Sequence, residues 1–212
     1  MPVSLTPAGH QQPVSGLTHH PVQPVWVRAW HWINVLAVLI MVTSGWRIYN
    51  ASPLFDFRFD DVLTLGGWLG GALQWHFAGM WLLAANGLFY LACNIGTGRM
   101  QTRFFPIKLS ALASDTAAAL RGKLTHADPR QYNSIQRLAY LFAVIVLALL
   151  ILSGLALWKP VQFALLRDLF GGYEFTRRVH FFAMAGLVGF VVVHVAMVAI
   201  VPRTLLTMIR GR

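Results

Sequence analysis

The sequence predicts an all-α membrane protein, a bundle of four transmembrane helices. Of its 212 residues, 57% are hydrophobic and only 11% are charged, whereas about 25% of the residues in soluble domains are charged. Four apolar stretches, each of 18 residues or more, carry no formal charge and are separated by charged segments. A helix of about 20 residues crosses a bilayer, so each stretch is long enough for one span.

The strong positive charge does not indicate a nucleic-acid-binding protein. The net charge is +10, but the 17 basic residues cluster between the apolar stretches and not along one polar face, as in the loops of membrane proteins. We therefore expect membrane lipid, and no nucleic acid, among the partners. The single cysteine, Cys93, excludes an internal disulfide, a cysteine-ligated iron–sulfur cluster and C-x-x-C-H haem attachment.

Residues 1–24 are expected to form a mobile N-terminal tail. They contain five prolines and no charged residue, and they lack the apolar core of a signal peptide, so cleavage is not expected. His10, His19 and His20 are expected to be solvated, with weak metal binding as the less favoured alternative.

The first two spans are expected at about residues 25–49 and 72–95. The first contains 18 uncharged residues in succession, and the second lies within 37 uncharged residues that end before Arg99. A cluster of glycines indicates a loose loop leading into the second span, namely Gly66, Gly67, Gly70 and Gly71.

The other two spans are expected at about residues 138–158 and 178–202. The third has 21 uncharged residues and is followed by Pro160, which cannot continue a helix. The fourth has 24 uncharged residues. Between the second and third spans lies a long loop, 96–137, and a basic C-terminus, 204–212, follows the fourth; both are expected in the cytoplasm.

Charge asymmetry predicts the orientation. With the N-terminus inside, eleven of the 17 basic residues are on the inner side and six on the outer side. The positive-inside rule therefore favours a multi-pass protein of the bacterial inner membrane with both termini cytoplasmic. Within the loop, helical spacing predicts a further helix on the membrane surface, formed by Leu109, Leu112, Ala113, Thr116 and Leu120. A solvated helix or a docking surface is a nearly equal alternative.

Four histidines occur in or beside the predicted spans, at two depths. His180 and His194 are fourteen residues apart on the fourth span, so they share a helix face about 21 Å apart along the axis. The direction of each span places His31 near the inner surface and His76 near the outer one. Two pairs result: His76 with His180 outside, and His31 with His194 inside.

Paired imidazoles on facing helices are typical axial ligands of a b-type haem. Because they occupy both axial positions of the iron, such a site passes electrons and does not activate oxygen. The alternative for each histidine is a structural hydrogen bond to a backbone carbonyl. A metal transporter would need acidic residues within the spans, whereas the seven acidic residues are expected in loops.

Arginines beside the histidines are candidates for contact with haem propionates. Arg28 is three residues before His31, and Arg177 is three before His180, so each shares a helix face with its histidine. Arg178 directly follows Arg177. Guanidinium groups pair well with carboxylates, but ordinary interfacial arginines would occur at the same places.

Small and polar residues are candidates for further ligand contacts. Gly45 and Gly154 at the outer depth and Gly87 at the inner depth would let a flat macrocycle approach, although glycine also serves helix packing. Candidates for a quinone site are polar residues near the helix ends, namely Asn34, Asn86, Tyr90 and Tyr140.

Six segments together resemble the prokaryotic cytochrome b561 family. They are RAWHWINVLAVLIMVTSGW at 28–46, WHFAGMW at 75–81, YNSIQRLAY at 132–140 with LSGLALW at 152–158, and RRVH followed by VVVHV within 177–195. The family includes the b-type cytochrome subunits of nickel hydrogenases and membrane formate dehydrogenases. The YNSIQ and SGLALW segments most resemble members that accompany molybdopterin oxidoreductases.

The resemblance implies two haem b groups and a quinone as exchangeable substrate. It implies that His31 and His194 ligate the inner haem iron, and His76 and His180 the outer one. Family members move electrons between a partner outside the membrane and the quinone pool.

We therefore expect a membrane-anchored di-haem cytochrome b subunit rather than an enzyme acting on its own. A periplasmic redox subunit, such as a molybdopterin oxidoreductase, would dock on the outer loops 47–70 and 159–176. The alternative is a stand-alone oxidoreductase that passes electrons from a diffusing donor such as superoxide to quinone, with Arg177 and Arg178 attracting the anion.

Overall fold

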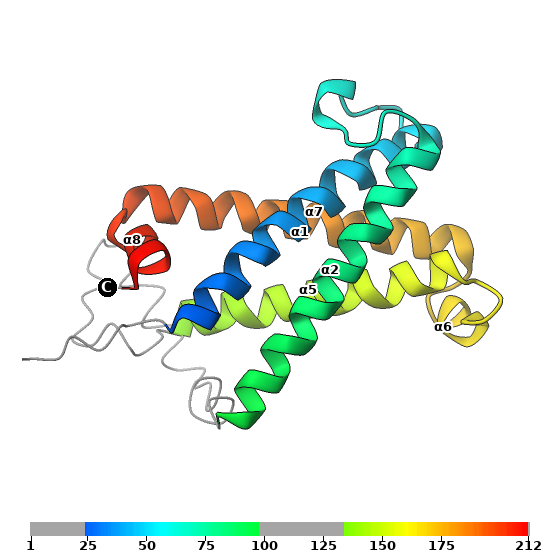
Figure 1. Cartoon of the computed structure of the whole chain (residues 1–212). Helices are drawn as coiled ribbons and strands as arrows, with labels where there is room; N and C mark the ends of the chain where they lie inside the picture. The colour runs from blue at the N-terminus through cyan, green and yellow to red at the C-terminus, as the bar shows by residue number, and fades with distance from the viewer. Residues whose placement is uncertain (1–23, 98–133, 212) are drawn as a thin grey trace, which may run out of the picture.

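The computed structural model describes residues 24–97 and 134–211, and these residues form helices and connecting loops without a strand (Figure 1). The elements are α1 (Val25–Ala51), the 3-10 helix η1 (Asp61–Leu63), α2 (Leu69–Gly96), α5 (Ser134–Trp158), α6 (Ala164–Leu169), α7 (Tyr173–Ile200) and α8 (Arg203–Arg210). The predicted tail and the predicted surface helix around Leu109–Leu120 lie outside the described residues.

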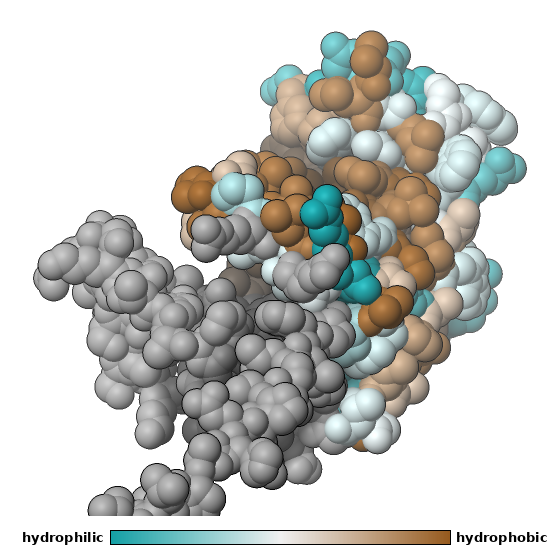
Figure 2. Space-filling view, turned by 60° about the vertical axis from the view of Figure 1, so that its left-hand side comes forward, coloured by the Kyte–Doolittle hydropathy of each residue, from teal (hydrophilic) through white to brown (hydrophobic). Residues whose placement is uncertain are grey.

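The four-span prediction is confirmed. By length and composition, α1, α2, α7 and residues Leu141–Trp158 of α5 can each cross a membrane. Large apolar side chains are exposed along all four helices, and Figure 2 shows such apolar residues over much of the described surface. Lipid can cover this apolar surface, so the chain is a multi-pass membrane protein.

The four long helices form two hairpins. Helix α1 packs against α2 and α5 packs against α7, whereas close backbone approaches between the hairpins are few. Figure 1 shows the two pairs crossing at an angle. Glycine permits close packing within the first hairpin, because a Cβ added at Gly79 of α2 would lie 3.0 Å from the side chains of Ile40 and Met41 on α1. The space between the hairpins is therefore wider than the space within each.

Helix α2 begins three residues before the predicted start, because Gly70 and Gly71 belong to its first turn. A Cβ at Gly70 would collide with the ring of Trp68, and one at Gly71 would collide with the carbonyl oxygen of Gly66. Because the obstacle at Gly71 is backbone, only glycine fits there, and this pair belongs to the helix start and does not form a loose loop.

Proline and glycine set the ends of the second hairpin. Helix α5 ends at Trp158, two residues before Pro160. Helix α7 starts at Tyr173, five residues before the predicted boundary, after Gly171 and Gly172, which have φ angles of 86° and 95°. Side chains other than glycine rarely adopt such angles. Because α7 starts this early, Glu174 lies in its first turn and not in the loop where it was expected.

Two short helices lie in segments for which no helix is predicted from the sequence. Helix α6 is in the connection between α5 and α7, and α8 follows Pro202 in the basic C-terminus. Helix α8 folds back toward the start of α1, where Arg28 Nη1 donates to the carbonyl of Ile209 at 2.7 Å and Trp32 Nε1 donates to that of Met208 at 3.3 Å.

Candidate functional site

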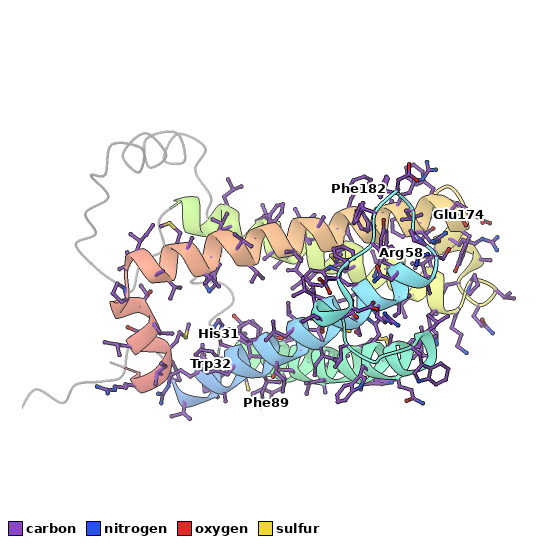
Figure 3. The ribbon with its side chains drawn as sticks, turned by 90° about the horizontal axis from the view of Figure 1, so that it is seen from above. His31, Trp32, Arg58, Phe89, Glu174 and Phe182 are labelled. Carbon is purple, nitrogen blue, oxygen red and sulfur yellow. The ribbon has the colours of Figure 1, made fainter. Side chains whose placement is uncertain are left out.

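The two ends of the bundle are formed by different segments of the chain. We call the end formed by residues 52–68 and 159–172 the loop end, and the end formed by the start of α1 and by α8 the terminal end. Figure 3 shows His31 and Trp32 toward the terminal end, and Arg58, Glu174 and Phe182 toward the opposite one. The loop end is the one for which the sequence predicts the periplasmic side; this orientation stays a prediction.

The structure brings His76 of α2 and His180 of α7 together toward the loop end. Their ring centres are 6.5 Å apart and their ring planes meet at 65°. The two residues come from different hairpins, so this loop pair bridges the space between them.

His31 of α1 and His194 of α7 form a second pair toward the terminal end. Their ring centres are 6.2 Å apart and their planes meet at 60°. Aromatic rings flank this terminal pair: Trp32 is edge-on to His31 at 5.4 Å, and Phe190 is stacked on His194 at 6.0 Å. His194 is exposed. The structure thus brings together the two pairs that depth along the helices predicts.

The distance within each pair fits two axial ligands of one metal ion. An imidazole nitrogen bonds a transition metal at about 2 Å, so two rings on opposite sides of one ion have centres roughly 6 Å apart. Both observed values, 6.5 and 6.2 Å, agree with this spacing. Direct hydrogen bonding between two imidazoles would bring the ring centres closer than a bridging metal does. Among the described residues, no group of three or more His, Cys, Asp or Glu side chains gathers as a metal site.

Unsatisfied buried donors supply a second test of the fit. Arg28 Nε and Trp30 Nε1 near the terminal pair, and Trp46 Nε1 two residues beyond Ser44, are buried without a hydrogen-bond partner among the described residues. Buried N–H groups normally have an acceptor. No described residue accepts from these donors, so they remain open to an acceptor on a bound group, such as a haem propionate.

The arginines predicted to contact propionates already have protein partners in two of three cases. Arg28 bonds to α8, as described above, and Arg177 donates to Glu174 at 3.0 Å and to the carbonyl of Ser52 at 2.5 Å. Arg178 is exposed and makes no hydrogen bond within the described residues. Their contact with a propionate stays a prediction.

Glycines adjoin the loop pair as expected. A Cβ added at Gly45 would lie 3.4 Å from Cε1 of His76, and one at Gly154 would lie 3.4 Å from Cε1 of His180. At Gly87 nothing lies within 4 Å. The first two glycines therefore leave the edges of the loop-pair imidazoles unobstructed.

Two of the proposed quinone residues take part in packing between α1 and α2. Asn86 is buried and donates from Nδ2 to the carbonyl of Trp30 at 3.0 Å, and the ring of Tyr90 is stacked on Trp30 at 3.9 Å. The side chain of Tyr140 lies outside the described residues. The structure therefore ties Asn86 and Tyr90 to the hairpin and leaves Asn34 half-buried.

Sequence reasoning missed two buried serines beside the loop pair. Ser44 Oγ is 3.0 Å from Nδ1 of His76, and Ser153 Oγ is 2.8 Å from Nδ1 of His180. The available signal was the repeated Ser-Gly pair, in TSGW on α1 and in LSGLALW on α5. Each serine stands immediately before one of the glycines just described.

Comparison with known proteins agrees with this geometry. The sequence profile of the family described as "Prokaryotic cytochrome b561" matches residues 22–211. A relative from Azospira oryzae, named "Putative protein-methionine-sulfoxide reductase subunit YedZ1", is 60% identical over 192 residues, which are 91% of this chain and 97% of the relative. Helical architecture, paired histidines and sequence similarity agree: this chain belongs to the prokaryotic cytochrome b561 family and is a membrane haem-b electron-transfer subunit.

Proposed function

We propose that this protein carries electrons from membrane quinol, by way of two haem b groups, to a periplasmic reductase that acts on oxidised methionine in proteins. His76 and His180 would hold one haem at the loop end, and His31 and His194 the other at the terminal end. Each bound haem supplies reversible one-electron transfer at its iron.

One observation carries the proposal. Two histidine pairs have ring-centre distances of 6.5 and 6.2 Å and lie toward opposite ends of one bundle. His180 and His194 come from the same helix, about 21 Å apart along its axis. Helix α7 therefore contributes a ligand at each depth, which suits transfer across the membrane and not chemistry at one surface.

The terminal end is the end that we assign to quinone exchange. His194 is exposed there, and Trp32 and Phe190 flank the pair with apolar rings. A quinone ring is flat and largely apolar, so it suits such surroundings. Helix α8 lies beside the same pair through its bonds to Arg28 and Trp32.

The loop end is the end that we assign to the reductase. Aromatic rings of residues 55–59 pack on Phe181, the neighbour of His180; the ring centres of Phe55 and Phe181 are 5.3 Å apart. Phe57 and Phe182 in the same cluster remain exposed. Exposed aromatic side chains close to a redox centre suit a protein docking site.

The relative's name supports our choice of partner and of the direction of electron flow. A reductase subunit must deliver electrons, so quinol would be the donor and the reductase the acceptor. The resemblance to members that accompany molybdopterin oxidoreductases suggests a molybdopterin cofactor in that partner. The stand-alone superoxide reaction is the less favoured alternative. Arg178 is exposed and could attract an anion, but Arg177 is paired with Glu174 at 3.0 Å and offers less charge.

Haem content and coupled turnover test the proposal. The purified chain should contain two haem b per polypeptide, as measured by its pyridine haemochrome spectrum. Quinol should reduce both haems, and a methionine sulfoxide reductase supplied with a sulfoxide should reoxidise them. A content of one haem or none would contradict the proposal. Reduction of the haems by superoxide, with electrons passing on to quinone and no reoxidation by the reductase, would overturn the assignment of the partner.

A further inference from the structure

We infer that Ser44 and Ser153 are positioning residues that set the tautomer and the electron donation of the two loop-pair histidines. The inference rests on the proposed function, since it concerns the haem that His76 and His180 would hold. Both serines are fully buried. Their hydroxyl oxygens lie 3.0 and 2.8 Å from the Nδ1 atoms of the two rings.

The proton of the Ser44 hydroxyl has one available direction. Ser44 Oγ lies 2.5 Å from the carbonyl oxygen of Ile40. A carbonyl only accepts hydrogen bonds, so two oxygens at this distance require the hydroxyl proton between them. Ser44 Oγ therefore accepts from His76, and Nδ1 of His76 carries the donated proton. Ser44 Oγ also lies 3.3 Å from the carbonyl oxygen of Met41, which is likewise only an acceptor.

The same arrangement recurs on the other hairpin. Ser153 Oγ lies 2.5 Å from the carbonyl oxygen of Leu149 and 3.4 Å from that of Leu150. In both hairpins the serine is therefore the acceptor of the proton on Nδ1 of the histidine. The next residue, Gly45 or Gly154, would place a Cβ 3.4 Å from the same ring.

A proton fixed on Nδ1 has two consequences for the ring. Neutral imidazole has one protonated nitrogen and one lone pair, so Nε2 keeps the lone pair that a metal ligand needs. The Nδ1–H donor also makes the imidazole more basic, as partners of metal-bound histidines generally do. A more basic ligand favours the oxidised over the reduced iron. The serines should therefore lower the reduction potential of the loop-end haem.

The terminal pair offers a comparison within the same chain. Among the residues that the structure describes, neither His31 nor His194 has a hydrogen bond to its ring; their neighbours are Trp32 and Phe190. Removing the serine hydroxyls should therefore change one haem and leave the other unchanged.

A redox titration of the purified full-length cytochrome, followed by visible spectroscopy, tests the inference with Ser44→Ala, Ser153→Ala and the double variant. Each single change should raise the ratio of reduced to oxidised loop-end haem about threefold at a fixed potential, in keeping with the loss of one hydrogen bond. This corresponds to an upward shift of about 28 mV, at 59 mV per tenfold. His76→Ala, which should retain only the terminal haem, identifies which wave belongs to which site.

Thr43→Ala is the matched control. Thr43 Oγ1 makes the same kind of bond, to the carbonyl of Leu39 at 2.7 Å, but does not contact a histidine. Ser44→Thr and Ser153→Thr keep the hydroxyl and should restore the wild-type potential. Loss of the loop-end haem in the alanine variants, with recovery in the threonine variants, would also support the inference.

Three results would overturn it. They are an unchanged loop-end potential in both alanine variants, an equal shift in Thr43→Ala, and haem loss that threonine does not restore. Failure of the proposed function is separate, because it would appear as fewer than two haems in the unmodified protein.

Discussion

The two histidine pairs have nearly the same ring spacing but very different surroundings. At the loop end, each ring is hydrogen-bonded to a buried serine and has a glycine at its edge. At the terminal end, the rings lie among aromatic side chains, one histidine is exposed and α8 lies alongside. The difference indicates that hydrogen bonds hold the loop-pair rings in fixed orientations, in keeping with the protein docking proposed for that end. The terminal end is more open, which suits exchange with a small molecule.

Replacing single ligands gives the largest expected effect and tests whether the two sites are independent. His76→Ala should leave one haem per chain, and His194→Ala should also leave one, but at the other site. The physical reason is that each pair shares no residue with the other, although His180 and His194 occupy the same helix. Haem content and the redox potential of the remaining haem are the measurements.

The two variants serve as each other's control. If both retained a haem with the same potential, the sites would not be the two pairs described here. Loss of both haems in either variant would show that the bundle folds around both groups together and that the ends are not independent.

Replacing Gly45 or Gly154 with a larger residue is expected to have the next largest effect. Gly45→Ala should be tolerated, because its methyl group would only touch the ring of His76 at 3.4 Å. Gly45→Val and Gly154→Val add branches that press on the imidazoles. Displaced ligands should weaken haem binding at the loop end by about tenfold or more, as measured by haem retention during dilution or transfer to a haem-binding acceptor.

Gly189→Val is the control for these substitutions. Nothing lies within 4 Å of a Cβ at this position on α7. The variant therefore measures how much valine destabilises a helix when it does not touch a histidine ring. Equal haem loss in the control would mean that helix stability, and not ligand displacement, explains the result.

Much of the architecture follows from the sequence because the bilayer restricts the possibilities. A span needs about 20 apolar residues and a fully bonded backbone, so charge-free stretches predict four helices. The observed starts precede the predicted ones by three to five residues in α2, α5 and α7. The pairing of His31 with His194 and of His76 with His180 follows in turn, since depth along a straight helix can be counted.

What the sequence does not predict depends on the rotation and packing of helices. The contact of Ser44 with His76 requires the relative rotation of α1 and α2, which residue spacing along one helix does not specify. The Trp68 ring and the Gly66 carbonyl lie against Gly70 and Gly71 in the first turn of α2, and these tertiary contacts cannot be read from the sequence. Helix α8 contains two basic residues in eight, and only its contact with α1 distinguishes it from a frayed terminus.

The two ends also differ in that α8 docks beside the terminal pair. Arg28→Ala removes the bond from Nη1 to the carbonyl of Ile209, which should destabilise the docked helix by about 1–2 kcal/mol, as expected for a hydrogen bond from a charged group. Amide hydrogen exchange in residues 203–211 should then become roughly tenfold faster. The potential of the terminal haem should shift while that of the loop-end haem stays constant.

Arg178→Ala is the control, since Arg178 is exposed and does not contact α8. Unchanged exchange in Arg28→Ala would show that α8 is held by its apolar contacts alone. A shift confined to the loop-end haem would contradict the placement of α8 beside the terminal pair.

The smallest effect is expected from the ion pair at the start of α7. Glu174 and Arg177 are 3.0 Å apart, but the Glu174 side chain is 68% exposed, so the pair should contribute no more than about 1 kcal/mol, and less at high salt. Arg177 also donates to the carbonyl of Ser52 at 2.5 Å, which ties α7 to the loop after α1. Glu174→Ala should therefore lower thermal stability only slightly, and Arg177→Ala should lower it more. If the two variants were equally stable at high salt, the bond to Ser52 would contribute nothing, and the loop end would owe its rigidity to the serines and glycines around the histidines.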